Sequence, residues 1–251
     1  MRIVKLYKCN SEEEVLAVVR QDGEAPDYVP ENLITAELCL EAVRQDGTAL
    51  EDVPEHLRTA ELCLEAVRQD GTALNYVPYN QRTMEICLEA VRQNGWALEY
   101  VPENLMTAEI CLEAVKESGW ALQYMPKSLI TAEICLEAVR QDGTALEYVP
   151  MHFRTAEFCL EALKESGMAF KYVPWGQINL SVPATAEFCL EAVKNNGFAL
   201  QYVPWEQLKL TVPAMKELCI EGMKSICKKS LEMLVPEALR DEVRAALKSG
   251  A

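Results

Sequence analysis

The sequence predicts an all-α fold, a single solenoid of short two-helix repeats with capping segments at both ends. Two observations predict it. A cysteine, a glycine and a proline each recur every 24 residues, and the last interval of the glycine and the proline and the last two of the cysteine are 30 residues. Apolar residues between them follow the spacing of one face of an α-helix. Self-similarity at a fixed period indicates a repeat architecture, in which each unit buries its apolar face against its neighbours. The periodic cysteines are Cys39, Cys63, Cys87, Cys111, Cys135, Cys159, Cys189 and Cys219.

The period divides the chain into a cap segment at 1–10, eight repeats, and a degenerate ninth repeat with a C-terminal capping helix at 215–251. Two repeats are longer by six residues, because inserts at 175–184 and 205–214 follow their prolines. Inserts in repeat proteins map to loops on one face, which is often the binding face. The eight repeats are 11–34, 35–58, 59–82, 83–106, 107–130, 131–154, 155–184 and 185–214.

The first helix of the repeat is illustrated by the residues that follow Thr35. Thr35 is a suitable N-cap, and Glu37 places a negative charge in the first turn. Cys39, with the alanine and valine that follow it at i+3 and i+4, forms the apolar stripe. Gly47 ends the helix, and we expect it to have a positive φ there.

The second helix begins at Thr48 and ends at Val53, because Pro54 cannot continue it without losing a hydrogen bond. Pro54 then starts a short helical or 3₁₀ turn that ends at Leu57, whose side chain points inward. Helices of this length are not stable alone in water. Stacked neighbours must therefore supply the burial.

The two ends are expected to act as caps. Ser11 to Glu14 fits a capping box. Pro236 to Lys248 reads as an amphipathic helix, with Leu239, Val243 and Leu247 at helical spacing. Terminal units that depart from the consensus keep a solenoid soluble.

Composition excludes several classes of function. The formal net charge is −15, from 39 acidic and 24 basic residues. Nucleic acids and anionic membranes attract Lys and Arg, so we expect neither direct nucleic-acid binding nor membrane binding. No apolar run reaches the roughly 18 residues of a transmembrane helix. Residues 1–10 do not resemble a signal peptide.

Ten cysteines would suit a disulfide scaffold or a metal site, but their period argues against both. Stacked helices lie about 10 Å apart, whereas a disulfide needs Cα atoms within about 7 Å and zinc holds sulfur at about 2.3 Å. We expect each periodic cysteine to be a small buried apolar side chain. Free thiols indicate a reducing compartment, so the expected location is the cytoplasm, or a host cell for a delivered effector.

No constellation of residues predicts catalysis. The two histidines, His56 and His152, do not recur from repeat to repeat, and no glycine-rich phosphate loop or Cys/His grouping is present. We therefore expect no enzyme activity, no cofactor and no metal.

Glutamates form two rows one helical turn apart. They are either a solvated helix face or an acidic surface for a basic protein partner. A row of basic residues that includes Arg44 partly offsets their negative charge. The first row includes Glu37, Glu61, Glu85, Glu109 and Glu133, and the second includes Glu41, Glu65, Glu89, Glu113 and Glu137.

Aromatic and other large apolar residues are the candidate binding anchors. The position after the glycine is threonine in three repeats, which indicates exposure, and stacking would place two tryptophans there side by side. Adjacent exposed tryptophans would form a binding hot spot, or else they cover a seam between repeats. The insert tryptophans are either a second patch or loop packing. The candidates are Trp96, Trp120, Met168 and Phe198 after the glycine, Trp175 and Trp205 at the inserts, and Tyr79 after a proline.

The segment from Leu136 to Tyr148, LEAVRQDGTALEY, resembles the tandem repeat of the domain-of-unknown-function 4116 family. The resemblance extends over about residues 11–230 and lies chiefly in the pattern AV-x-x-D/N-G-x-A-L. The family often has Ala-Ser where this chain has Val149-Pro150, so we expect the second helix to end sooner here. The resemblance implies tandem α-helical repeats, found in bacterial and protist proteins that include secreted effectors. It implies no enzyme activity and no known ligand.

These features together favour a non-enzymatic, protein-binding solenoid that presents aromatic anchors on an acidic surface. The alternative is an acidic decoy of the effector or phage type, which would inhibit a nucleic-acid-binding protein by occupying its basic site.

Overall fold

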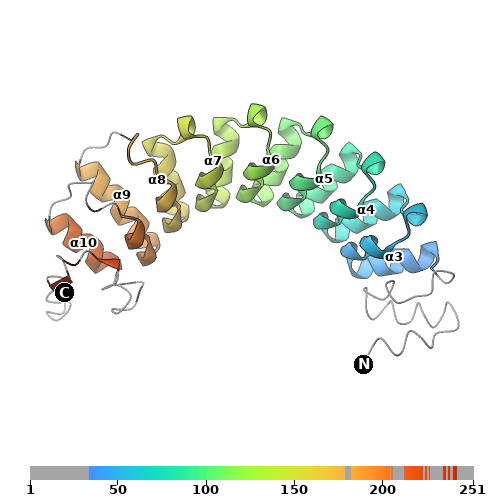
Figure 1. Cartoon of the computed structure of the whole chain (residues 1–251), viewed down its shortest axis with the longest axis horizontal. Coiled ribbons are helices and arrows are strands. Elements are labelled where there is room, and N and C mark those ends of the chain that lie inside the picture. The colour runs from blue at the N-terminus through green and yellow to red at the C-terminus, as the bar shows by residue number, and fades with distance from the viewer. Residues whose placement is uncertain are drawn as a thin grey trace, which may run out of the picture. The chain divides into compact units, whose positions relative to one another are not determined.

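The structure is a computed structural model of the chain (Figure 1). It describes residues 34–178, 182–203, 205, 212–222, 224, 226, 234, 235, 237, 240 and 241. The described residues contain helices and turns and no β-strand. The chain forms two compact units, Met1–Ile130 and Thr131–Ala251, and the division falls on the start of a repeat.

In the first unit, each described repeat contributes one α-helix and two 3₁₀ helices, labelled η. Repeats that are consecutive in the sequence lie next to one another in the structure (Figure 1). The elements are α3 (Ala36–Gln45), η3 (Gly47–Asp52), η4 (Glu55–Leu57), α4 (Ala60–Gln69), η5 (Gly71–Tyr76), η6 (Tyr79–Gln81), α5 (Met84–Gln93), η7 (Gly95–Tyr100), η8 (Glu103–Leu105), α6 (Ala108–Glu117), η9 (Gly119–Tyr124) and η10 (Lys127–Leu129).

The second unit continues the plan and changes at the inserts. After Pro174 the chain makes a turn in place of a short 3₁₀ helix, and α9 is longer than the helices before it. The elements are α7 (Ala132–Gln141), η11 (Gly143–Tyr148), η12 (Met151–Phe153), α8 (Ala156–Glu165), η13 (Gly167–Tyr172), α9 (Val182–Asn195), η14 (Gly197–Tyr202) and α10 (Val212–Gly222).

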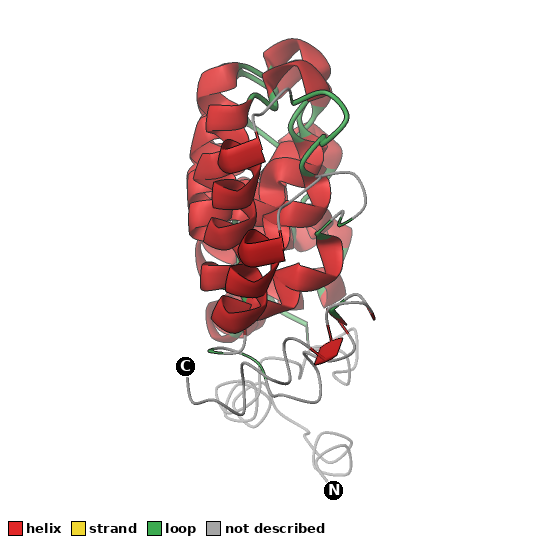
Figure 2. Ribbon diagram, turned by 90° about the vertical axis from the view of Figure 1, so that its left-hand side faces the viewer, coloured by secondary structure: helices red, strands yellow, loops and turns green. Residues whose placement is uncertain are grey.

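The apolar side chains are buried by the stacking of successive repeats, as the sequence predicts. Within each unit, the α-helices of successive repeats contact one another, and each six-residue 3₁₀ helix packs on its own α-helix and on the next one. Figure 2 shows that helices make up nearly all of the described chain, with short loops between them. Leu38 and Cys39 of α3, and Leu50 of η3, have no exposed surface. The predicted all-α solenoid is confirmed.

The expected positive φ at the repeat glycine is wrong. α3 ends at Gln45 with Asp46 in an extended conformation, and Gly47 is the first residue of η3, with φ outside the left-handed region. Glycine is required for a different reason. A Cβ on Gly47 would lie 2.4 Å from the carbonyl oxygen of Ala66 in the next repeat. The glycine therefore permits close stacking rather than a turn.

Asp46 begins the second helix as well as ending the first. Its Oδ1 accepts hydrogen bonds from the Thr48 N–H at 2.9 Å and from the Thr48 hydroxyl at 2.6 Å. This side-chain cap satisfies an N–H that a 3₁₀ helix leaves without a partner. The helix ends at Asp52, just before Val53 and Pro54, and the short turn after the proline is the expected 3₁₀ helix.

Several predictions lie outside the described residues. They are the cap segment at 1–10, the first repeat at 11–34 with its capping box, parts of both inserts and the C-terminal helix from Pro236 to Lys248.

Candidate protein-binding surface

The first row of glutamates is an exposed edge of the α-helices. The Thr35 hydroxyl accepts a hydrogen bond from the Leu38 N–H at 3.3 Å, which fixes the start of α3 and holds Glu37 in its first turn. A carboxylate there is favoured by the helix dipole. Every described member is exposed, and the row runs through Glu37, Glu61, Glu85, Glu109, Glu133, Glu157, Glu187 and Glu217.

The second row of glutamates is half-buried and is engaged with the basic row. An arginine near the end of one α-helix reaches the glutamate of the next repeat: Arg44 to Glu65 at 3.3 Å. The same pairing joins Arg68 to Glu89 at 3.5 Å, Arg92 to Glu113 at 3.2 Å and Arg140 to Glu161 at 3.5 Å. Glu41 and Glu137 occupy the equivalent half-buried positions.

Lysine replaces arginine in some repeats and pairs within its own helix. Lys116 lies 2.8 Å from Glu113, and Lys164 lies 3.1 Å from Glu161. Hydrogen bonds from Lys116 and then Arg92 lower the pKa of Glu113. The second row is therefore largely neutralised, and the first row carries the available negative charge.

The periodic cysteines are buried free thiols. All eight are buried in the described chain. Burial raises the pKa of Cys63 and of Cys111 to about 11, and that of Cys189 to about 12. A thiol is reactive as the thiolate, so these side chains act as packing groups at neutral pH. No group of three metal-ligating side chains occurs among the residues that the structure describes.

Trp96 and Trp120 form a stacked pair on η7 and η9. Their ring centroids are 6.3 Å apart with an interplanar angle of 17°. The Tyr124 ring meets the edge of Trp96 at 6.0 Å and 66°. Trp96 keeps 42% of its surface exposed, and Trp120 is half-buried. We call Trp96, Trp120 and Tyr124 the aromatic platform.

The platform replaces a stabilising contact found in three other repeats. Thr72 and Thr144, like Thr48, donate their hydroxyls to the capping aspartate at 2.6–2.7 Å. A tryptophan has no such hydroxyl. Before Trp96 the cap is Asn94, which accepts only the backbone N–H, and before Trp120 the cap is Ser118, whose side chain makes no capping bond.

Glu99 is a carboxylate close in sequence to the platform. It follows Trp96 by three residues on η7, and side chains at i and i+3 of a 3₁₀ helix lie over one another. The equivalent Glu147 accepts the Tyr172 hydroxyl of the next repeat, and interaction with the equivalent Glu51 raises the pKa of Tyr76. Glu99 is exposed and makes no hydrogen bond or ion pair with any residue described here.

The other apolar candidates fall into exposed and packed groups. Phe198, on η14, is 46% exposed, and Met168, on η13, is half-buried. Trp175 is half-buried against Phe170 at 4.8 Å and against Phe188 at 6.3 Å, so its ring packs the start of the insert. Trp205 is half-buried, and most of the insert that follows it lies outside the described residues.

Tyr79 is separate from the platform. It begins η6, on a turn between η5 and α5, and 68% of its surface is exposed. The guanidinium carbon of Arg82 lies 5.9 Å from the centre of its ring. Tyr79 is thus a single exposed ring, without a neighbouring aromatic partner among the described residues.

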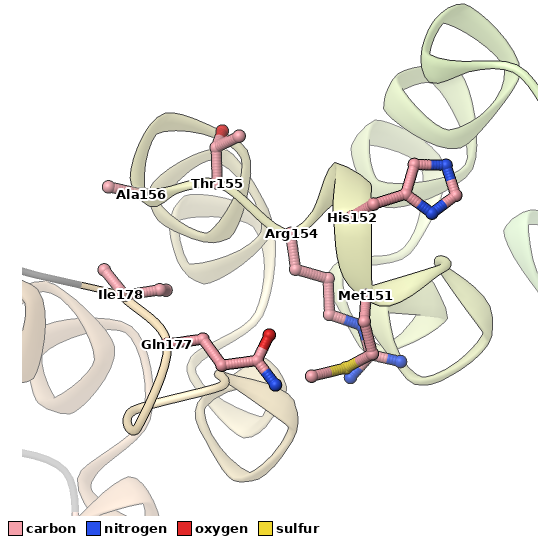
Figure 3. Close-up of a pocket in the computed structure, with 7 residues that line it drawn as sticks. All are labelled: Met151, His152, Arg154, Thr155, Ala156, Gln177 and Ile178. Atoms are coloured by element: carbon pink, nitrogen blue, oxygen red, sulfur yellow. The ribbon is translucent and has the colours of Figure 1, made fainter.

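A cavity of about 300 Å³ opens in the second unit beside the first insert. Figure 3 shows Arg154 entering it from the η12 side and Gln177 from the insert side. Arg154 donates to the carbonyl oxygens of Val149, Glu147 and Tyr172 at 2.7–3.0 Å, and burial lowers the pKa of its guanidinium. Its charge therefore supports the backbone at the edge of the cavity.

Sequence reasoning missed this arginine clamp. Arg58 donates to the Val53, Glu51 and Tyr76 carbonyl oxygens at 2.7–2.9 Å. Arg82 and Arg154 make the equivalent hydrogen bonds from their own repeats. The clamp ties the C-terminal ends of two successive 3₁₀ helices together. Its signal in the sequence is an arginine four residues after the proline. Met106 and Ile130 replace it in the two repeats that carry the platform.

The geometry therefore defines the protein as an α-helical tandem-repeat protein whose exposed features lie on a regular frame. The sequence model of the family described as "Domain of unknown function (DUF4116)" matches five times, over residues 11–58, 35–82, 59–106, 83–130 and 131–175. The chain belongs to this family. The first four matches each cover two of the 24-residue repeats and overlap by one. Comparison with curated proteins gives no match.

Among the helices of the described part of the chain, none has both the length and the apolar character needed to cross a bilayer.

Proposed function

We propose that this protein is a non-enzymatic binding solenoid that holds a protein partner on the aromatic platform of Trp96, Trp120 and Tyr124. One observation carries the proposal: a stacked tryptophan pair, with Trp96 exposed and Trp120 half-buried, occupies a position that is threonine in three other repeats. Tryptophan is enriched at the energetic centres of protein interfaces. Neighbouring rings held rigidly by 3₁₀ helices would lose little conformational entropy on binding.

The local cost of the platform supports this proposal. The two repeats that carry it lack the threonine–aspartate bond and the arginine clamp, both of which stabilise the neighbouring repeats. Local departures from a consistent plan are expected at functional sites.

The test begins with a photo-crosslinking amino acid at position 96, using the same substitution at position 72 as the matched control. A crosslinked protein is then purified, and its affinity for the chain is measured by calorimetry. The double substitution of Trp96 and Trp120 by alanine should weaken binding at least tenfold with an unchanged circular dichroism spectrum. Equal affinity, or unfolding of the variant, would count against the proposal.

A second candidate function rests on the exposed first glutamate row. Glu61, Glu85 and Glu109 make no ion pair with residues described in the first unit. Such a row would suit an acidic decoy that occupies the basic site of a nucleic-acid-binding protein. Binding by this row should weaken steeply as ionic strength rises from low to moderate, because exposed charges are screened. An affinity that is insensitive to salt would exclude the decoy.

A further inference from the structure

The carboxylate of Glu99, which makes no hydrogen bond or ion pair with the described chain, indicates what kind of chemical group would bind at the platform. In another repeat, the equivalent Glu147 accepts a hydrogen bond from Tyr172 of the next repeat, and interaction with the equivalent Glu51 raises the pKa of Tyr76. At the platform, Tyr124 instead packs its ring against the edge of Trp96. Glu99 is exposed, three residues after Trp96 on η7, without a hydrogen bond or ion pair to the described chain. An indole face and a free carboxylate together form a site for a cation.

We propose that the platform and Glu99 together receive an arginine side chain from a basic segment of the protein partner. This inference rests on the proposed function and names the group that it recognises. A guanidinium is planar, so it can stack on an indole while its edge donates to a carboxylate. A lysine ammonium is a compact, strongly hydrated charge and cannot make both contacts as well.

The charge of the surrounding repeats favours the same occupant. Residues 35–130 hold 16 acidic and 7 basic side chains. The basic row in this range is largely committed, since Arg44, Arg68 and Arg92 pair with glutamates of the next repeat. The field around the platform is therefore negative, and it would draw a basic segment toward the indoles.

The experiment uses the full chain labelled with 5-fluorotryptophan and observed by ¹⁹F NMR. Each of the four tryptophan signals is assigned by a single tryptophan-to-phenylalanine substitution. The probe is a capped pentapeptide of alternating glycine and arginine, titrated to millimolar concentration. Matched peptides carry lysine or citrulline instead of arginine, because citrulline keeps the shape of arginine and lacks its charge.

The arginine peptide should shift the Trp96 and Trp120 signals saturably and leave the Trp175 and Trp205 signals unchanged. The lysine peptide should bind at least threefold more weakly, and the citrulline peptide should give no saturable shift. Glu99→Gln should weaken the arginine peptide at least fivefold. Glu51→Gln is the matched control, because Glu51 interacts with Tyr76 and follows a threonine, not a tryptophan, by three residues, and it should change affinity less than twofold.

Three results would overturn the inference: no shift at Trp96 and Trp120, equal shifts with the citrulline peptide, or equal weakening by Glu99→Gln and Glu51→Gln. The last result would indicate attraction to the general charge of the chain. Failure here is distinguishable from failure of the proposed function. If a crosslinked partner loses affinity on substitution of the tryptophans but not on Glu99→Gln, the platform binds protein without recognising arginine.

Discussion

The repeats at 35–82 and those at 83–130 share one backbone plan but differ in what stabilises it. In the first pair, Thr48 and Thr72 bond to their capping aspartates, and Arg58 and Arg82 each join three carbonyl groups. In the second pair, tryptophans replace the threonines, and Met106 and Ile130 replace the arginines. Stabilising contacts are absent where exposed aromatic rings appear, a trade typical of functional surfaces.

The largest expected effect concerns a feature that both pairs share, the buried thiols. Cys63 in the first pair and Cys111 in the second both have a pKa raised to about 11. The folded-state pKa lies above that of the unfolded chain, so the neutral thiol stabilises the fold fully below the unfolded pKa. This contribution is lost as pH rises toward the folded value, by about 1.4 kcal/mol per pH unit for each thiol.

We therefore expect the melting temperature, followed by circular dichroism, to fall steeply between pH 8.5 and 10.5. Because other groups titrate in this range, the Cys63→Ala/Cys111→Ala variant serves as the control and should show a shallower pH dependence. An identical pH dependence in that variant and in the wild type would contradict the prediction.

Close stacking is also common to both pairs. A Cβ on Gly71 or on Gly95 would lie 2.3 Å from a backbone oxygen of the next repeat. Either Gly→Ala substitution should lower the free energy of unfolding by about 3 kcal/mol, because backbone cannot move aside as a flexible side chain can. Gly176→Ala is the matched control, with no atom within 4 Å of the new carbon. Chemical denaturation measures all three, and wild-type stability of Gly71→Ala would refute the packing account.

The arginine clamp separates the two pairs. Arg58→Met should destabilise the protein by about 2 kcal/mol, because three carbonyl groups lose a charged donor. Met106→Arg should have the opposite sign and add about 1 kcal/mol, because it introduces at the equivalent position the residue that Arg58 and Arg82 supply in the first pair. Urea denaturation of both variants measures these two changes in the free energy of unfolding. A destabilised Met106→Arg variant would show that the second pair cannot accept the clamp.

The smallest effect is expected from the ion pairs between α-helices, which continue through both pairs. Arg44 and Glu65 are 3.3 Å apart, and their side chains are 54% and 35% exposed. A double-mutant cycle with Arg44→Ala and Glu65→Ala should give a coupling energy below about 0.5 kcal/mol that decreases with salt. A coupling energy well above 1 kcal/mol would contradict this prediction, because it would mean that the ion pairs between successive α-helices stabilise the fold appreciably.

The sequence was sufficient for the features that depend on period. Cys39 and its apolar neighbours predict a buried helix face, and Pro54 predicts the end of the second helix, because both are local effects of spacing and backbone chemistry. The role of Gly47 was misjudged, since the approach of Ala66 is a property of stacked repeats and not of the local turn.

Two of the functional features could not be predicted from the sequence, because they too depend on contacts between stacked repeats. Arg58 follows a surface turn and reads as a solvated residue until the neighbouring carbonyl groups are in place. Glu99 is one of many glutamates in the sequence, and only the orientation of Tyr124 distinguishes it. The tryptophans were identifiable, because they break a regular threonine position.

The central claim is that the aromatic platform binds a protein, and its most direct test is the affinity of the crosslinked partner for two matched variants. Trp96→Thr/Trp120→Thr carries the residue found in the neighbouring repeats, and Thr48→Ala/Thr72→Ala changes the same position in the first pair. We predict that calorimetry will show at least tenfold weaker binding for the first variant and less than twofold change for the second. Equal affinities of both variants for the partner would contradict the account.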